Sequence, residues 1–196
     1  MSLAAESELN TRQRLIFAVL DLLRTQGLAA TSVREAAKHA QTPLGSTYHY
    51  FPDGKPQMVK EALLLSGNIA LEQLDKALNQ HGTRKGITAF IAWWGRIVQD
   101  SSFQAGCPLM SVLMEIGKDD EKVQYVETVK QVLNLWKQRL TQALEQDGIS
   151  FEQATQVSLS IIASFEGAIL LCRAWGNLTP FQAVTAQLDV MIKNLI

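Results

Sequence analysis

Residues 31–55, TSVREAAKHAQTPLGSTYHYFPDGK, are the stretch of the sequence that decides the fold. Ser32 precedes Glu35 by three residues, the spacing of a capping box, in which each side chain satisfies a free backbone N–H at a helix start. Small apolar residues then recur at helical spacing, namely Val33, Ala36, Ala37 and Ala40. A stripe of small side chains lets a second helix cross close by. The stretch therefore begins with a short helix that packs against another one.

A second short helix is expected to follow directly. Thr42 and Pro43 indicate its start, because a hydroxyl cap followed by a proline suits a first helical turn. We expect it to run to about Tyr50, because the sequence FPDG at residues 51–54 favours a turn. Two helical turns are too short to be stable alone, so neighbouring helices must hold them. With small, hydroxyl and aromatic groups outward, the pair is predicted to be a helix-turn-helix whose second helix enters the DNA major groove.

The run PLGSTYHYFPDGK, residues 43–55, resembles the recognition helix of the tetracycline-repressor (TetR) family of transcriptional repressors. Its FPxGK ending, together with Gly-Cys-Pro at residues 106–108, is similar to the LmrA/YxaF-like branch of that family. The specific resemblance covers residues 11–60. Gln41 and Thr42 stand where the family usually has Gly-Val, and Leu44 replaces a frequent Lys. We therefore expect Gln41 to adopt a left-handed conformation at some energetic cost.

The residue types and the resemblance together imply the DNA contacts. Ser32 is expected to cap the first helix and to touch a phosphate. Arg34 either reads a guanine through its planar fork or is a solvated surface residue. Leu44, Gly45 and Thr47 are expected to face the groove, with Leu44 against a thymine methyl. Four further residues match phosphate-contacting positions of the family motif: Ser46, Tyr48, His49 and Lys55.

The rest of the chain is predicted to be helical. Apolar periodicity predicts helices over residues 11–26, 55–80, 84–100, 107–116, 119–146, 151–175 and 179–195. The sequence HGT at residues 81–83 predicts a break after the long helix that starts near Lys55. Strand signals are absent from the sequence. The expected fold is all-α: a helix-turn-helix DNA-binding head, residues 1–54, joined by a long helix to an effector-binding and dimerisation body, residues 55–196.

Composition and charge are those of an ordinary globular protein. The formal net charge is −1, with 47% hydrophobic and 19% charged residues, so charge alone does not indicate nucleic-acid binding. The first 60 residues carry a net +2 and the remainder −3, which is a weak asymmetry in the direction of a basic head. Two distant cysteines indicate a reducing cytoplasmic setting, and the polar first ten residues predict no signal peptide.

Enzyme and membrane functions are not expected. The longest apolar run, residues 159–175, contains polar and charged residues, which argues against a membrane span. The three histidines show no metal-ligand spacing, and no phosphate-binding loop or nucleophile elbow occurs, so we expect no metal, no cofactor and no catalytic residues. A small helical enzyme with Cys107 as nucleophile is the alternative in this class.

The last two predicted helices are the candidate dimer interface. Residues 159–175 are apolar nearly all round, which indicates burial on every side. Small residues permit close approach of a partner helix: Ser160, Ala163, Ser164, Gly167 and Ala168. The alternative is a central core helix within one monomer. The resemblance implies a two-fold homodimer on a palindromic operator.

Bulky apolar residues in the body are candidates for an effector site. Aromatic and thioether side chains lining a cavity with a few polar points would bind a hydrophobic or aromatic small molecule. The candidates are Trp94, Phe103, Met110, Met114, Trp136, Phe165 and Glu166; the alternative for each is ordinary core packing. A buried Glu166 must be paired, hydrogen-bonded or neutral. It is either a satisfied core or interface carboxylate, with Arg173 as a candidate partner, or an anchor for the ligand. Cys107 is expected to pack or touch ligand rather than to sense redox state.

These expectations combine into one mechanism. An unliganded dimer would bind its operator and block transcription, and ligand in the body would change the spacing of the heads and release the DNA. The alternative is a helical small-molecule-binding or interaction protein without specific DNA readout.

Overall fold

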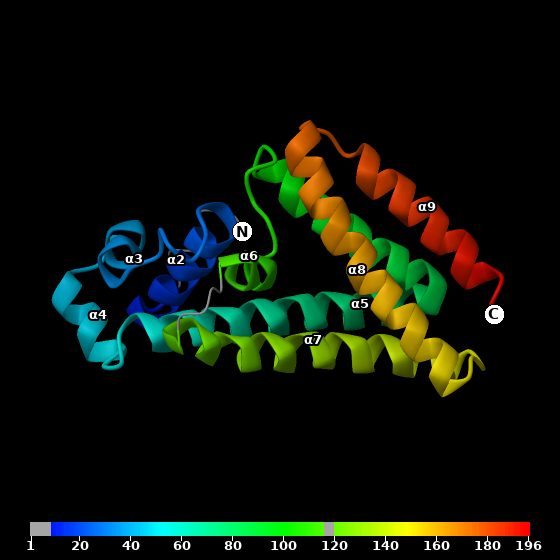
Figure 1. Ribbon diagram of the computed structural model, residues 1–196, viewed down its shortest axis with the longest axis horizontal. Helices are drawn as coiled ribbons and strands as arrows, with labels where there is room; N and C mark the ends of the chain where they lie inside the picture. Colours follow the sequence, from blue (N-terminus) through cyan, green and yellow to red (C-terminus); the bar gives the residue numbers. More distant parts are fainter. Residues whose placement is uncertain (1–8, 116–119) are drawn as a thin grey trace. The chain divides into compact units, whose positions relative to one another are not determined.

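The computed structural model describes residues 9–115 and 120–196, and within these ranges every regular element is an α-helix. The all-α prediction is therefore confirmed (Figure 1). The helices are α2 (Thr11–Thr25), α3 (Val33–His39), α4 (Leu44–Tyr50), α5 (Lys55–Asp100), α6 (Pro108–Glu115), α7 (Asp120–Gln146), α8 (Phe151–Trp175) and α9 (Thr179–Lys193). Residue 119, the expected start of the long amphipathic helix, and the polar residues 1–8 lie outside the described ranges.

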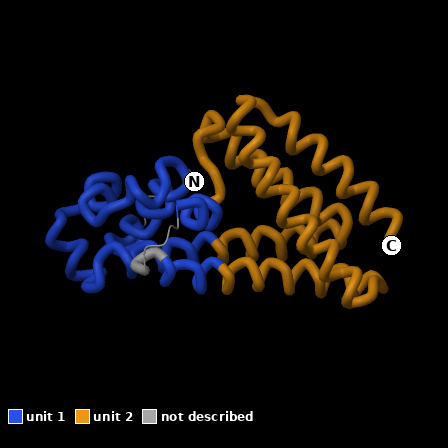
Figure 2. Tube along the Cα trace, in the orientation of Figure 1, with its two compact units in different colours: residues 1–66, 108–129 blue, residues 67–107, 130–196 orange. Residues whose placement is uncertain are grey.

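The chain forms two compact units, coloured separately in Figure 2. The first unit comprises residues 1–66 and 108–129, and the second comprises residues 67–107 and 130–196. Helices α5 and α7 each contribute to both units. The predicted functional domains, residues 1–54 and 55–196, do not coincide with these compact units. Their boundary stays a prediction.

Helix α2 is the central element of the first unit. Asn10 caps it in a complete capping box with Gln13. Gly27 follows the helix with φ of 88°, a left-handed conformation that a glycine adopts without a Cβ clash. The buried side of α2, including Leu15, Val19 and Leu23, packs against α3, α4 and α6.

The short helix α3 begins at the predicted cap, whereas α4 does not. At α3, Ser32 Oγ accepts a hydrogen bond from Glu35 N at 3.1 Å, which is the Ser32 half of the predicted capping box. Thr42 does not cap α4. Pro43 occupies the cap position instead, and the Thr42 hydroxyl lies 3.4 Å from Ala37 O, to which it donates. Because the hydroxyl turns back to α3, α4 begins without a side-chain cap.

Helix α5 contains the predicted break. Gly82 has φ of 74° and ψ of 175°, which is not helical, so two helical stretches meet there within residues 55–100. The space around the position of a Gly82 Cβ is open. Glycine is favoured at this point because a positive φ strains other residues.

Helices α8 and α9 pack together in the second unit. By length and composition α8 is apolar enough to span a membrane, with a mean hydropathy of 1.6 in its most apolar window. One side of it, including Ile161, Phe165 and Cys172, is buried within the unit. Its other side is exposed, including Leu159, Leu170 and Leu171, so α8 is a half-buried helix within the second unit.

Candidate DNA-binding surface and buried aromatic cluster

Helix α4 presents an exposed face. Leu44 is 39% exposed and Tyr48 54% exposed, and Gly45 and His49 are exposed as well. Leu44 and Tyr48 are four residues apart and therefore lie on the same side of the helix. Of the residues assigned to DNA contact, these four form the open surface of α4. Their contact with DNA stays a prediction.

Thr47 was expected to face the groove, and the structure contradicts this. Its side chain is fully buried, as is Phe51 four residues later. The spacing of four residues places both on the inner side of α4, opposite to the exposed face. The Thr47 hydroxyl has no hydrogen-bond partner within the described part of the chain. Thr47 therefore anchors α4 to the first unit instead of reaching base pairs.

The remaining DNA candidates flank α4. Arg34 is exposed near the start of α3, whereas Ser32 and Ser46 are partly buried. The Lys55 ammonium donates a hydrogen bond to Leu28 O at 2.7 Å. Lys55 thus holds the segment after α2, in addition to any role at a phosphate.

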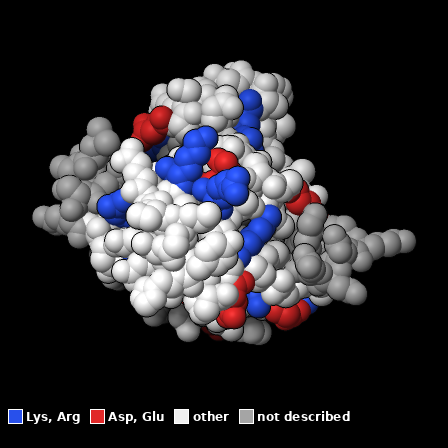
Figure 3. All heavy atoms as spheres, turned by 90° about the vertical axis from the view of Figure 1, so that its left-hand side faces the viewer, with Lys and Arg blue, Asp and Glu red and all other residues white. Residues whose placement is uncertain are grey.

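The charge on this end of the first unit is modest. Figure 3 faces the side that carries α3 and α4, and Lys and Arg side chains lie across its centre beside a wide uncharged area. This distribution agrees with the net +2 of the first 60 residues. Phosphate attraction is therefore only moderate, and specific contacts must contribute much of any DNA affinity.

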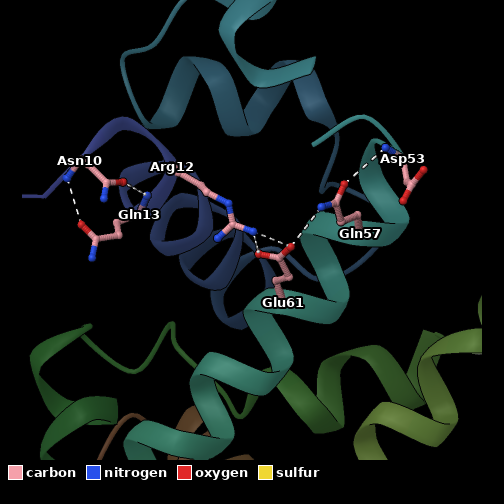
Figure 4. Close-up of polar contacts among 6 residues, drawn as sticks. All are labelled: Asn10, Arg12, Gln13, Asp53, Gln57 and Glu61. Carbon is pink, nitrogen blue, oxygen red and sulfur yellow. Dashed lines mark hydrogen bonds and ion pairs between the residues drawn. The ribbon is translucent and has the colours of Figure 1, made fainter. Parts of the chain in front are cut away.

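A polar network holds the C-terminal end of α4 (Figure 4). Arg12 Nη2 lies 2.8 and 2.6 Å from the two carboxylate oxygens of Glu61, and its guanidinium lies 5.0 Å from the ring centroid of Phe51. Gln57 Nε2 donates to Glu61 at 3.1 Å, and Asp53 N donates to Gln57 Oε1 at 3.3 Å. One arginine of α2 therefore connects the end of α4 to the first turns of α5.

A second arginine of α2 reaches the turn between α3 and α4. Arg14 Nη2 donates to Ala40 O at 2.6 Å and to Gln41 O at 3.0 Å. Gln41 has φ of 52°, so the expected left-handed conformation is confirmed. The turn before the recognition helix is thus held from α2.

Three of the effector candidates form a buried aromatic cluster in the second unit. The Trp94 and Phe165 rings stack at 5.8 Å with 17° between planes, and Trp136 lies 6.2 and 6.1 Å from them. All three are almost fully buried. Trp136 Nε1 donates to Gly67 O at 3.0 Å, whereas Trp94 Nε1 has no partner among the described residues.

Glu166 is buried beside this cluster. Burial raises the pKa of its carboxyl group to about 7, and a hydrogen bond with the Cys107 thiol opposes part of that rise. Its Oε1 atom has no partner within the described residues. The pairing with Arg173 that the sequence suggested is not among the contacts of the described residues, and the Cys107 thiol is the partner instead. Cys107 and Cys172 are both free and buried.

The other effector candidates are not part of the aromatic cluster. Met110 and Met114 lie on α6 in the first unit, and Met114 is 74% exposed. Phe103 is partly buried in the turn after α5, with φ of 63°. Their apolar side chains were the reason to group these residues with the tryptophans.

Two models of known protein families match this chain. Residues 15–62 match the bacterial regulatory proteins of the tetR family, and residues 83–187 match the C-terminal domain of LmrA/YxaF-like transcriptional regulators. The chain belongs to the TetR family. Its resemblance to the LmrA/YxaF-like branch is confirmed over more than half of its length.

Known TetR-family proteins resemble this regulator along most of its chain. It is 29% identical over 180 residues to an HTH-type transcriptional regulator of Mycobacterium tuberculosis, covering 90% of this chain and 91% of the relative. It is 24% identical over 185 residues to the HTH-type transcriptional regulator LmrA of Bacillus subtilis, covering 94% and 97%. A TetR regulator from Legionella pneumophila has the same fold, with a TM-score of 0.81 at 20% identity over 93% and 97% of the two chains.

Family membership settles the class of function. The protein is a helix-turn-helix DNA-binding transcriptional regulator and not an enzyme. Cys107, the nucleophile of the enzyme alternative, is instead a buried partner of Glu166.

The second unit of this TetR-family chain also has an open depression. A shallow depression of about 390 Å³ lies at the kink of α5, lined by His81, Gly82, Thr83, Arg84, Lys85, Asp147, Lys193 and Ile196. In the parts of the chain that the structure describes, no group of three His, Cys, Asp or Glu side chains is placed to hold a metal ion. Effector binding by the aromatic cluster stays a prediction.

Sequence reasoning missed the residues that position α4. Arg12 and Arg14 act on partners 49 and 26 residues away, and Glu115 accepts hydrogen bonds from Leu28 N and Ala29 N at 2.7 and 2.6 Å. A charged residue on a helix surface carries no sequence signal for a distant backbone partner. Asn10 differs, because its Asn-x-x-Gln spacing with Gln13 is a local sequence signal for a helix start.

Proposed function

We propose that this regulator is a cytoplasmic, ligand-responsive repressor that binds a palindromic operator as a homodimer. In this proposal a hydrophobic or aromatic small molecule enters the second unit and releases the DNA. The exposed face of α4 supports the proposal. A seven-residue helix is not stable alone, so the rest of the unit must hold it, with Thr47 buried and with Leu44 and Tyr48 left exposed. Such a helix is suited to the major groove.

Helices α8 and α9 supply the surface for the homodimer. Large apolar side chains are exposed along them: Leu159, Leu170, Leu171, Trp175 and Val190, all 45–61% exposed. Contiguous apolar surface of this kind marks a protein interface. Of the small residues considered for close approach, Ala168 is buried inside the unit, whereas Gly167 has open space at its Cβ position. A two-fold dimer would set two α4 helices about 34–36 Å apart on DNA.

The aromatic cluster supports the effector part of the proposal. Trp94 Nε1 and Glu166 Oε1 are buried without partners in the described chain. An unpaired buried polar group costs about 1–3 kcal/mol. A ligand that offers hydrogen bonds to these atoms would regain that free energy and stabilise a rearranged second unit. A coupling of about 1–3 kcal/mol would then change operator affinity about 5–150-fold.

Selection of duplexes from a random library tests the DNA part. Bound sequences should converge on a palindrome, and fluorescence anisotropy should show tighter binding to it than to a scrambled duplex. Arg34→Ala should relax the preference at one base pair in each half-site. A protein that binds neither selected nor random duplex at low salt would support the alternative, a helical ligand-binding protein without DNA readout.

Sedimentation velocity tests the dimer. Leu171→Asp would place a charge on the exposed stripe of α8 and should convert the dimer to monomer with weaker operator binding. Gln156→Asp, on an exposed position of the same helix, is the matched control. A wild-type protein that stays monomeric at micromolar concentration would overturn this part of the proposal.

A further inference from the structure

The turn between α3 and α4 is a complete Schellman motif with an unusual residue in it. Thr42 N donates to Ala37 O at 2.9 Å, and Gln41 N donates to Lys38 O at 3.1 Å. These are the two hydrogen bonds that define the motif. Its left-handed position is usually glycine, and here it is Gln41 with φ of 52°. Side chains other than glycine lose about 1–2 kcal/mol in this conformation.

The carbonyl groups of this turn find their partner on another helix. Ala40 O and Gln41 O follow the last hydrogen-bonded carbonyls of α3, so neither is satisfied by the Schellman bonds. Arg14 Nη2 donates to Ala40 O at 2.6 Å and to Gln41 O at 3.0 Å. A guanidinium at a helix C-terminus also interacts favourably with the helix dipole. The hydrogen bonds orient the two carbonyls on either side of the left-handed residue.

The position of α4 depends on this turn. Leu44, the first residue of α4, comes three residues after Gln41, and α4 has no side-chain cap of its own. A change of backbone angles at Gln41 would therefore rotate the whole recognition helix. Its exposed face, with Leu44 and Tyr48, would then meet base pairs at a different angle.

We propose that Arg14 is a positioning residue for operator recognition, because its guanidinium holds Gln41 in the left-handed conformation that sets the direction of α4. The proposal rests on DNA readout by α4, so binding of wild-type protein to its selected operator is measured first. Failure of that first measurement would concern the DNA-binding function and not Arg14.

The competing role for Arg14 is direct contact with a DNA phosphate. A phosphate contact acts on all sequences alike and contributes to the salt dependence of binding. A positioning role acts on the operator far more than on a scrambled duplex, because only specific contacts need α4 at one angle. The ratio of the two affinities therefore separates the roles.

The test uses Arg14→Gln, measured by fluorescence anisotropy on the selected operator and on a scrambled duplex. Operator affinity should fall about tenfold or more, since two hydrogen bonds from a charged donor are removed. Affinity for the scrambled duplex and its salt slope should stay within about twofold of wild type. Arg24→Gln is the matched control, because Arg24 lies on the same helix and pairs with Asp21 of that helix; it should bind as wild type does.

Rescue at residue 41 makes the test specific. Adding Gln41→Gly to Arg14→Gln should restore operator affinity to within about threefold of wild type, because glycine adopts the left-handed conformation without strain. Adding Gln41→Ala instead should not restore it, because alanine keeps the Cβ that causes the strain. This pair separates the backbone effect from loss of the exposed glutamine side chain.

Three results would overturn the proposal. The first is that Arg14→Gln binds the operator with wild-type affinity. The second is that Arg14→Gln loses affinity equally for operator and scrambled duplex, with the salt slope lowered by about one. The third is that Gln41→Gly and Gln41→Ala restore operator affinity equally. Thermal melts by circular dichroism establish that each variant is folded. Should Arg14→Gln fail to fold, Arg14→Lys keeps the charge without the planar fork and takes its place, with the same pattern of loss and rescue expected.

Discussion

Each of the two compact units of this TetR-family protein is stabilised internally by a different kind of contact. In the first unit, long polar side chains bind backbone atoms of distant segments: Arg14 holds the helix-turn-helix turn, Lys55 holds Leu28 O, and Glu115 holds the segment after α2. In the second unit, Trp94 stacks on Phe165 and Trp136 packs against both rings, so buried aromatic side chains dominate.

The difference follows from what each unit has to bury. Helices of seven residues cover little apolar area, so burial alone does not fix their angles, and directional hydrogen bonds must do it. Long helices with aromatic side chains bury enough area to be stable with imperfect polar pairing. The first unit therefore depends more on directional hydrogen bonds, and the second depends more on burial of aromatic side chains. Four measurements test this contrast, from the largest expected effect to the smallest.

Removing one ring should affect the second unit most. Phe165 is fully buried against Trp94, Trp136 and Phe90. Phe165→Ala should lower the free energy of unfolding by about 3–5 kcal/mol, because it loses burial and leaves a cavity. Urea unfolding followed by circular dichroism measures it. Phe151→Ala, on the same helix but 68% exposed, should cost less than about 0.5 kcal/mol.

Glu166 should make the stability of the second unit pH-dependent. Its folded-state pKa of about 7 exceeds the ordinary 4.5, so between these values the folded protein holds a proton that the unfolded chain has released. The contribution of Glu166 is therefore fully present below pH 4.5 and is lost as pH rises through 7, a change of up to about 3 kcal/mol.

Subtraction isolates this effect. Glu166→Gln cannot titrate, so the difference in unfolding free energy between variant and wild type should favour the variant more at pH 8 than at pH 5. A difference that is constant with pH, or that moves in the opposite direction, would contradict the assignment.

Glu115 tests the polar contacts of the first unit. Glu115→Ala removes the acceptor for Leu28 N and Ala29 N, and it should destabilise the unit by about 1–3 kcal/mol. Hydrogen exchange of these two amides, measured by NMR, should accelerate. Glu115→Gln keeps one acceptor oxygen and should have an intermediate effect. Unchanged exchange in Glu115→Ala would show that these hydrogen bonds add no local stability.

The Arg12–Glu61 pair should have the smallest effect. Its side chains are 43% and 25% exposed, so solvent screens much of the attraction. A double-mutant cycle with Arg12→Ala and Glu61→Ala should give a coupling of at most about 1 kcal/mol. A coupling above about 2 kcal/mol would mean that the contact with Phe51 makes this network as strong as a buried one.

The helices were predictable because their signals are local. Three of these signals act over a few residues: capping at Ser32, the glycine at residue 82 and the apolar periodicity of α8. The structure places helices where they indicated. Even the left-handed Gln41 could be predicted, from its place in a turn that usually has glycine. Thr42 was assigned wrongly as a cap, because its hydroxyl can bond either to the start of α4 or back to α3. In the structure it donates to Ala37 O of α3.

The candidate site was predicted less completely. The open face of α4 followed from the motif, but Thr47 was placed on the wrong side because a helix of two turns gives too few residues to fix its rotation. Arg173 was suggested as the partner of Glu166 because it lies two turns later on the same helix. The structure supplies Cys107 instead, from a loop 59 residues earlier in the chain.

The amino-acid sequence by itself determined the helical composition, the position of the helix-turn-helix and the family, because periodicity, caps and short motifs depend on near neighbours. The tertiary structure alone decided which side of α4 is free, that Arg14 holds the turn before it, and that Glu166 is buried beside a thiol. Burial and pairing across tens of residues arise only when helices pack, since each depends on atoms that the local sequence does not contain.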